Sequence, residues 1–228
     1  MEGAGDGFAM QDFLLNAVVT LLVTIDPFGL VPIFIVVTAG MGPAARRRAA
    51  LRATVTAAIV LVAFAFVGQP LLNTLGISIP AFRIAGGLLL FWIAFEMVFD
   101  LRRTRKAATA DLAASAPQVE FSSDDAAHDV AIFPLAIPLI AGPGAISATI
   151  LLSSRAPGYT GIAALIVIIV ALTAACFAVF LLADRIDRAL GATGRIVLTR
   201  LLGVILAALA IQFVADGVLT FATRAGGG

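Results

Sequence analysis

Long apolar segments separated by short polar turns dominate this chain of 228 residues. A helix needs about 20 mostly apolar residues to cross a bilayer, and by that measure the pattern predicts six membrane spans. Their approximate limits are 8–39, 51–72, 80–101, 130–153, 161–183 and 196–222. The linkers leave no room for a soluble catalytic domain. We therefore expect an all-α polytopic membrane protein with a single transmembrane domain over residues 1–228.

Helix-breaking residues interrupt the first span near its middle, where Asp26 precedes Pro27 and Gly29, and Pro32 follows. A carboxylate at that depth costs about 2.5–3.5 kcal/mol on insertion scales. The prolines lack N–H groups, so nearby carbonyls lose their helical partners. Because lipid cannot satisfy such groups, the break must face protein or a water-filled cavity. This pattern favours a binding site for a solute or ion, although an aspartate here could also act as a plain helix cap.

The second half of the chain repeats features of the first. Pro143, between Gly142 and Gly144, interrupts the fourth span and lies 116 residues after Pro27. Two arginines that open the third span of each half, Arg83 and Arg200, are 117 residues apart. Two pairs at nearly the same offset make a chance match improbable, so we expect an internal repeat.

Each half holds three spans, an odd number, so the second half must cross the membrane in the opposite direction. The sequence thus predicts a 3+3 inverted repeat with broken first and fourth helices. Its halves cover about 8–101 and 130–223, and a cytoplasmic loop of about 102–129 joins them. In transporters built this way, the substrate binds near mid-membrane, at discontinuous helices in matching positions of the two halves.

The basic residues are distributed unevenly between the two sides. Because successive spans cross the membrane in opposite directions, the loops lie alternately on its two sides. Twelve of the 15 lysines and arginines then fall on one side of the membrane and three on the other. The positive-inside rule then places the three basic loops in the cytoplasm and both termini on the periplasmic side of a bacterial inner membrane. Each basic cluster lies at the end of a span, so we interpret these residues as membrane anchors and expect no nucleic-acid partner.

The two breaks offer complementary groups to a zwitterion. Downstream half-helices begin near Gly29 and Gly144, and their free N–H groups suit a carboxylate. Upstream half-helices end in free carbonyls that suit an ammonium group. Asp26 could pair with that ammonium or carry a coupling proton. The candidate substrate-binding residues are Asp26, Pro27, Gly29, Pro32, Gly142, Pro143, Gly144 and Gln212.

Three acidic residues within the spans are candidates for gating or proton coupling, namely Asp26, Glu96 and Asp216. Glu96 and Asp216 are expected at roughly inverted depths, where each could pair with an arginine. Gln212 shares a helix face with Asp216 because the two residues are one turn apart. A further polar row lies on one face of the first span and either lines a polar path or joins helices; it consists of Asn16, Thr20 and Thr24.

The residue content argues against several other classes of function. His128 is the only histidine and Cys176 the only cysteine, which disfavours a histidine metal site and a Ser-His hydrolase. We expect no enzyme activity, no metal and no cofactor, although an intramembrane enzyme based on Asp26 and Glu96 stays open. Since the sequence has no phosphate-binding loop for ATP, energy must come from a gradient or a partner.

Three sequence motifs resemble those of the MarC family of bacterial integral membrane proteins. They span residues 25–34, 83–87 and 133–146, in the first, third and fourth spans. The chain departs from the family pattern at Leu30, where that family commonly has Asn. The resemblance implies six helices and a place near the lysine-exporter superfamily, and some members of the MarC family look like transporters of small neutral amino acids.

These observations together predict a secondary transporter of small neutral amino acids such as glycine or alanine, with proton coupling as an option. An ion or small-solute channel, or an exporter of other small metabolites, would use the same breaks and stays open as an alternative. The expected partners are the substrate and the lipid bilayer, and a homo-oligomer is compatible with the sequence.

Overall fold

The computed structural model describes residues 2–101, 136 and 139–225. Within these residues all regular structure is helical. The helices are α1 (Glu2–Ile25), α2 (Val31–Val37), α3 (Pro43–Thr74), α4 (Ile79–Val98), α7 (Pro143–Ser153), α8 (Gly158–Leu181) and α9 (Ala183–Ala225). The expected loop 102–129, with His128, and the start of the expected fourth span lie outside the described residues. The prediction of an all-α protein is confirmed.

Four of these helices are long and apolar enough to cross a membrane: α3, α4, α8 and the part of α9 from Thr193 to Thr223. Two shorter apolar helices accompany them, Met10–Ile25 within α1 and the whole of α7. These helices overlap the expected spans, although α3 begins at Pro43, eight residues before the expected start. The first expected span, 8–39, contains two helices, α1 and α2, because the chain leaves the helical conformation between them.

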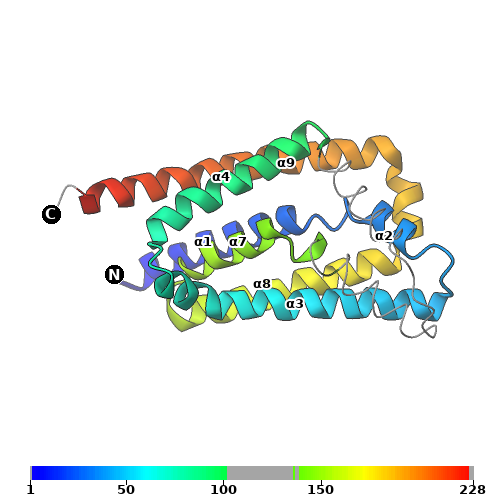
Figure 1. The fold of residues 1–228 in the computed structure, drawn as a ribbon, viewed down its shortest axis with the longest axis horizontal. Coiled ribbons are helices and arrows are strands. Elements are labelled where there is room, and N and C mark those ends of the chain that lie inside the picture. Colours follow the sequence, from blue (N-terminus) through cyan, green and yellow to red (C-terminus); the bar gives the residue numbers. More distant parts are fainter. Residues whose placement is uncertain (1, 102–135, 137–138, 226–228) are drawn as a thin grey trace.

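The helices form three layers, with α1 and α7 in the middle (Figure 1). The pair α4 and α9 packs on one side of this middle layer, and the pair α3 and α8 packs on the other side. The start of α1 and the end of α9 lie at the same end of the molecule (Figure 1). This arrangement places the end of α1 and the start of α7 inside the bundle.

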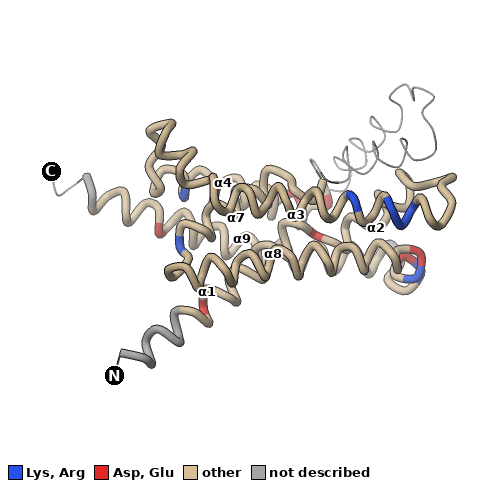
Figure 2. The backbone as a smooth tube through the Cα atoms, turned by 90° about the horizontal axis from the view of Figure 1, so that it is seen from below, with Lys and Arg blue, Asp and Glu red and all other residues tan. Residues whose placement is uncertain are grey.

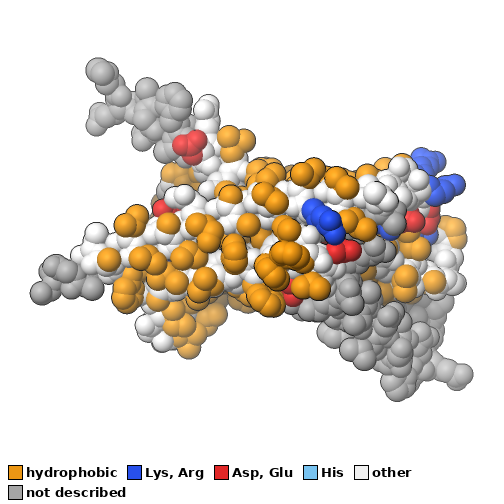
Figure 3. Space-filling view, turned by 90° about the horizontal axis from the view of Figure 1, so that it is seen from above, with side chains coloured by type: hydrophobic (Ala, Val, Ile, Leu, Met, Phe, Trp, Pro, Cys, Tyr) orange, Lys and Arg blue, Asp and Glu red, His pale blue; other side chains and the backbone are white. Residues whose placement is uncertain are grey.

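Apolar side chains cover much of the face seen in Figure 3, and many of the charged positions in Figure 2 lie toward the ends of the bundle. Many of the blue Lys and Arg positions in Figure 2 lie at the end opposite the two termini, where α3 and α9 begin. Large exposed apolar residues such as Leu201, Val204 and Leu219 on α9 would be unfavourable in water. A surface of this kind fits the hydrocarbon core of a bilayer.

Glycines allow α4 and α9 to approach each other closely. A Cβ atom on Gly87 would lie 3.0 Å from the carbonyl oxygen of Ala210 and 2.7 Å from a methyl carbon of Val214. A Cβ on Gly203 would lie 3.1 Å from the carbonyl oxygen of Ala94. Small residues at such contacts let two membrane helices pack backbone against backbone.

The variant Gly87→Ala is expected to destabilise the protein, because its methyl group has no room between α4 and α9. Overpacking of this kind costs about 1–3 kcal/mol. The matched control is Gly194→Ala, whose Cβ would meet only Leu190, at an ordinary 3.6 Å. Thermal unfolding in detergent measures the midpoint temperature of both purified variants. A midpoint for Gly87→Ala equal to that of the control would contradict the close α4–α9 contact.

Candidate functional site at the broken helices

The first break lies between α1 and α2 and contains Asp26, as the sequence indicates. Asp26 adopts the left-handed backbone conformation with φ 55°, which lets the chain leave α1 sharply. Its carboxylate accepts a hydrogen bond of 3.1 Å from the backbone N–H of Gly29. Only 3% of Asp26 is exposed. Pro27 has no N–H, so the carbonyl of Val23 lacks its usual helical donor.

Gly29 holds this turn in place because it has no side chain. A Cβ atom at this position would lie 2.1 Å from Oδ2 of Asp26, far inside any permitted contact. The carboxylate therefore occupies the space that any larger residue would need. Gly29 is thus a positioning residue for Asp26. Pro32 lies in the first turn of α2, where a missing N–H costs little.

The second break precedes α7. Gly142 caps this helix in an extended conformation, and Pro143 is its first residue. Just upstream, the N–H of Ala141 donates to the carbonyl oxygen of Ala136 at 2.9 Å, a five-residue π-type turn. Gly144 is buried against α4, where a Cβ atom would lie 2.3 Å from the side chain of Ile93. Residues 139–142 thus leave the α-helical pattern before α7 begins.

The two breaks lie at a similar depth within the bundle (Figure 1). The end of α1 and the start of α7 both lie midway along the molecule, and these two helices are in contact (Figure 1). The last carbonyls of α1 carry partial negative charge, and the first N–H groups of α7 carry partial positive charge. Asp26 adds a carboxylate beside the end of α1. The middle of the bundle therefore combines groups suited to a cation with groups suited to an anion.

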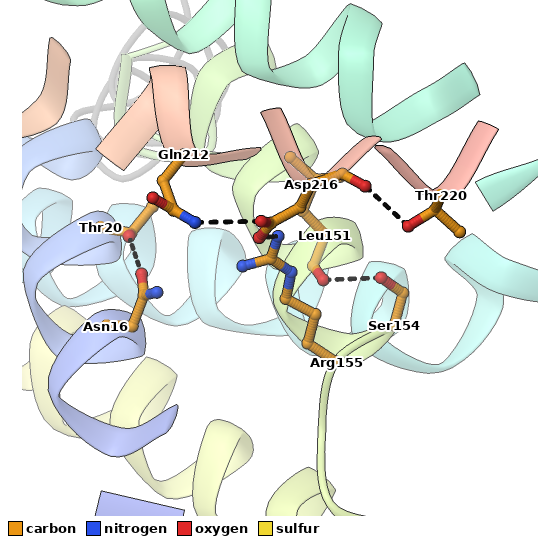
Figure 4. Close-up of polar contacts among 8 residues, drawn as sticks. All are labelled: Asn16, Thr20, Leu151, Ser154, Arg155, Gln212, Asp216 and Thr220. Atoms are coloured by element: carbon orange, nitrogen blue, oxygen red, sulfur yellow. Dashed lines mark hydrogen bonds and ion pairs between the residues drawn. The ribbon is translucent and has the colours of Figure 1, made fainter. Parts of the chain in front are cut away.

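A second polar cluster surrounds Asp216 on α9 (Figure 4). Its carboxylate forms an ion pair with Arg155, which follows α7, and accepts a 3.0 Å hydrogen bond from Nε2 of Gln212. The Arg155 guanidinium also lies over the ring of Phe213, 4.4 Å from the ring centre. The expected arginine partner of Asp216 is therefore Arg155. Gln212 is exposed and belongs to this cluster.

The remaining candidates make contacts mainly within their own helices. Glu96 is 5% exposed, and its Oε1 accepts a 3.1 Å hydrogen bond from the indole Nε1 of Trp92, on the same helix. In α1, the hydroxyl of Thr20 donates to Oδ1 of Asn16 and the hydroxyl of Thr24 donates to the carbonyl of Thr20. A role for any of these residues in binding or gating stays a prediction.

Sequence reasoning missed a third cluster, which joins the two halves of the chain. Arg46, just inside α3, makes two hydrogen bonds of 2.9 and 3.2 Å to the carboxylate of Asp184 on α9. The Arg46 guanidinium lies 5.1 Å from the ring centre of Phe34, and that ring stacks on Phe180 with centres 4.4 Å apart. Arg46 was interpreted only as a membrane anchor, since no spacing in the sequence connects it to Asp184.

Taken together, the apolar helices and the interrupted, charge-bearing middle layer define a multi-pass integral membrane protein. The chain belongs to the MarC family of integral membrane proteins, whose model matches residues 11–222. The resemblance seen in the three motifs is thereby confirmed.

Relatives of this chain occur in distantly related organisms. It is 35% identical to the UPF0056 membrane protein YhcE of Escherichia coli, over 87% of this chain and 88% of the relative. It is 32% identical to the UPF0056 membrane protein YvbG of Bacillus subtilis, over 92% and 95%, and 34% identical to a UPF0056 membrane protein of Pyrococcus abyssi, over 88% and 91%. No solved structure matches the chain.

Proposed function

We propose that this protein is a secondary transporter of small neutral amino acids, such as glycine and alanine, and not an enzyme. The observation that carries the proposal is the buried carboxylate of Asp26, which lies at a mid-bundle helix break at about the depth where α7 begins. Buried ionisable groups within a membrane domain typically mark the path of a substrate or ion. Asp26 is proposed either to pair with the substrate ammonium or to carry a coupling proton.

The N-terminus of α7 is the proposed partner of the substrate carboxylate. This helix has 11 residues and begins in the middle layer, so its first N–H groups have no helical acceptor. An amino-acid zwitterion would then lie between two groups of opposite charge, the α7 start and Asp26.

Helix ends and packing support an inverted repeat of the two halves. Val37 ends α2 and Ser153 ends α7, and these residues are 116 positions apart, like Pro27 and Pro143. Gly87 faces Ala210 and Val214, while Gly203 faces Ala94 and Val98. Adding 116 to Gly87, Ala94 and Val98 gives Gly203, Ala210 and Val214, so one contact becomes the other when the halves are exchanged.

The same exchange relates whole helices. Helix α2 packs on α8 and α9, and α7, its equivalent in the second half, packs correspondingly on α3 and α4. Each remaining major pair, α3 with α8 and α4 with α9, joins equivalent helices of the two halves. A pseudo-two-fold relation of this kind supports alternating access, in which one half moves against the other around a fixed site.

The proposed orientation places both termini on the periplasmic side of the inner membrane. The ends of α3 and α9 that carry many of the arginines lie opposite the termini (Figure 2), and the positive-inside rule assigns such ends to the cytoplasm. Arg155 and Asp216 would then lie toward the periplasm, and Arg46 and Asp184 toward the cytoplasm. A homo-oligomer is compatible with this arrangement.

Counterflow in proteoliposomes tests the proposal. Vesicles that contain the purified protein and are loaded with unlabelled alanine should take up labelled alanine faster than empty vesicles, with a rate that saturates. Glycine inside the vesicles should also drive this exchange, and a bulky cationic amino acid such as arginine should not. Flux that never saturates would indicate a channel. Absence of counterflow with every small neutral amino acid would contradict the proposed substrate class.

A further inference from the structure

The two short helices that begin at the breaks, α2 and α7, each have an arginine shortly after their C-terminal end that contacts α9. Arg46 follows α2 and Arg155 follows α7, each within a few residues of the connecting turn. Both arginines pair with an aspartate of α9, and both lie over a phenylalanine ring. The same combination of chemical groups therefore occurs twice, at opposite ends of the bundle.

The first combination joins α2 and α3 to α8 and α9. Phe34 and Phe180 are each 1% exposed and stack nearly parallel, at an interplanar angle of 3°. Arg46 covers the outer face of this aromatic pair and holds Asp184 with two hydrogen bonds. We call these four residues the α2 gate. It lies at the end of the bundle where the α2–α3 turn is.

The second combination joins the end of α7 to α9 (Figure 4). Phe213 is 1% exposed, and Arg155 lies over its ring while pairing with Asp216. Gln212 supplies a further hydrogen bond to the same carboxylate, which fixes its orientation. We call Arg155, Gln212, Phe213 and Asp216 the α7 gate. It lies at the opposite end, beside the α7–α8 turn.

We propose that the α2 gate and the α7 gate open in turn and admit substrate to the Asp26 site from opposite sides of the membrane. The inference rests on the proposed transport function and adds the residues that control access. In this structure both ion pairs are formed, and we assign this arrangement to closed gates. The gate on the α2 side uses Asp184, whereas the sequence pointed to Glu96.

The chemistry of the gates suits reversible opening. Both ion pairs are partly exposed, with 26% and 58% of the Arg46 and Asp184 side chains accessible, and exposed ion pairs contribute little net stability. The buried phenylalanine rings exclude water, while the arginines hold the rings in place. Loss of one arginine should therefore loosen one end of the bundle and leave the other end closed.

Thiol labelling of a buried reporter tests the inference without any transport measurement. The reporter is Thr24→Cys, at the end of α1 and 2% exposed, in full-length protein that also carries Cys176→Ala to remove the native thiol. A membrane-impermeant maleimide is added to right-side-out or inside-out vesicles. With both gates intact, we expect slow labelling from either side.

Each gate variant should raise labelling severalfold from its own side only. Arg46→Ala should expose the reporter at the face with the α2 gate, and Arg155→Ala at the face with the α7 gate. The matched control, Arg200→Ala, removes an exposed arginine of α9 outside both gates and should change nothing. Unchanged labelling in both variants, or a rise from both faces at once, would overturn the inference.

A charge exchange separates gating from misfolding. Arg46→Asp alone should open the α2 gate, and Arg46→Asp combined with Asp184→Arg should close it again, because the ion pair is restored. Failure of the double variant to slow labelling would contradict a role for the ion pair. Because this readout needs no substrate, normal gating with no alanine counterflow would contradict the proposed function alone.

Discussion

Asp26→Asn is expected to abolish uphill, pH-gradient-driven alanine uptake, because the neutral amide can neither carry the coupling proton nor attract an ammonium group. Asn is the appropriate replacement for structural reasons. It tolerates the left-handed conformation of residue 26, at φ 55°, and its amide oxygen still accepts the N–H of Gly29. The turn should therefore keep its shape while its charge is lost.

Exchange of alanine without a pH gradient tells the two roles of Asp26 apart. If the carboxylate binds the ammonium, its loss removes a charged hydrogen bond of about 1.5–3 kcal/mol. Counterflow at low alanine concentration should then fall about tenfold or more, since about 1.4 kcal/mol changes a binding constant tenfold. If the carboxylate only carries a proton, counterflow should persist while uphill uptake is lost.

Asp100→Asn is the matched control, since Asp100 also has a positive φ, of 60°, but lies after the end of α4. Transport by this variant should match that of the native protein in both assays. Native rates of both uphill uptake and counterflow in Asp26→Asn would remove Asp26 from the mechanism.

Gly29→Ala is expected to reduce transport about a hundredfold, because misplacing a functional group by about 1 Å can cost that much. The added Cβ would lie 2.1 Å from Oδ2 of Asp26, so either the carboxylate or the backbone of the break must move. Alanine counterflow measures the loss. Size-exclusion chromatography in detergent shows whether the variant remains folded.

Two comparisons identify the origin of this effect. Gly42→Ala places the same methyl group at a glycine with nothing within 4 Å of its Cβ and should transport normally. If Gly29 acts through Asp26, the double variant Gly29→Ala with Asp26→Asn should be little worse than Asp26→Asn alone, because coupled residues are not additive. Full additivity would indicate that Gly29 has a separate role.

Local chemistry made the breaks predictable from the sequence. Proline removes a backbone donor at its own position, so Pro27 and Pro143 mark the ends of helical segments without any knowledge of tertiary contacts. The apolar lengths of α3, α4 and α8 likewise identify them as spans, because the required length is set by the bilayer. For the same reason, the break at Asp26 could be located to within a few residues.

The contacts between distant segments were not predictable in this way. Arg46 and Asp184 are 138 residues apart, and nothing in the spacing of either residue distinguishes a partner in this ion pair from a membrane anchor. The close approach of Gly87 to Ala210 depends on how α4 and α9 cross. Such pairings follow from three-dimensional packing. An internal repeat predicts a contact in one half only when the equivalent contact in the other half is already known.

The conformation of Gly191 has a consequence for how the two ends of α9 move. Its backbone angles, φ 59° and ψ −178°, interrupt the helix between Asp184 and the long segment that carries Asp216. This region of conformational space is essentially restricted to glycine. In the proposed gating, residues 183–190 would rotate about Gly191 while the remainder of α9 stays packed along α4. Asp184 and Asp216 both belong to α9, yet with this rotation one of their ion pairs could break while the other stays formed.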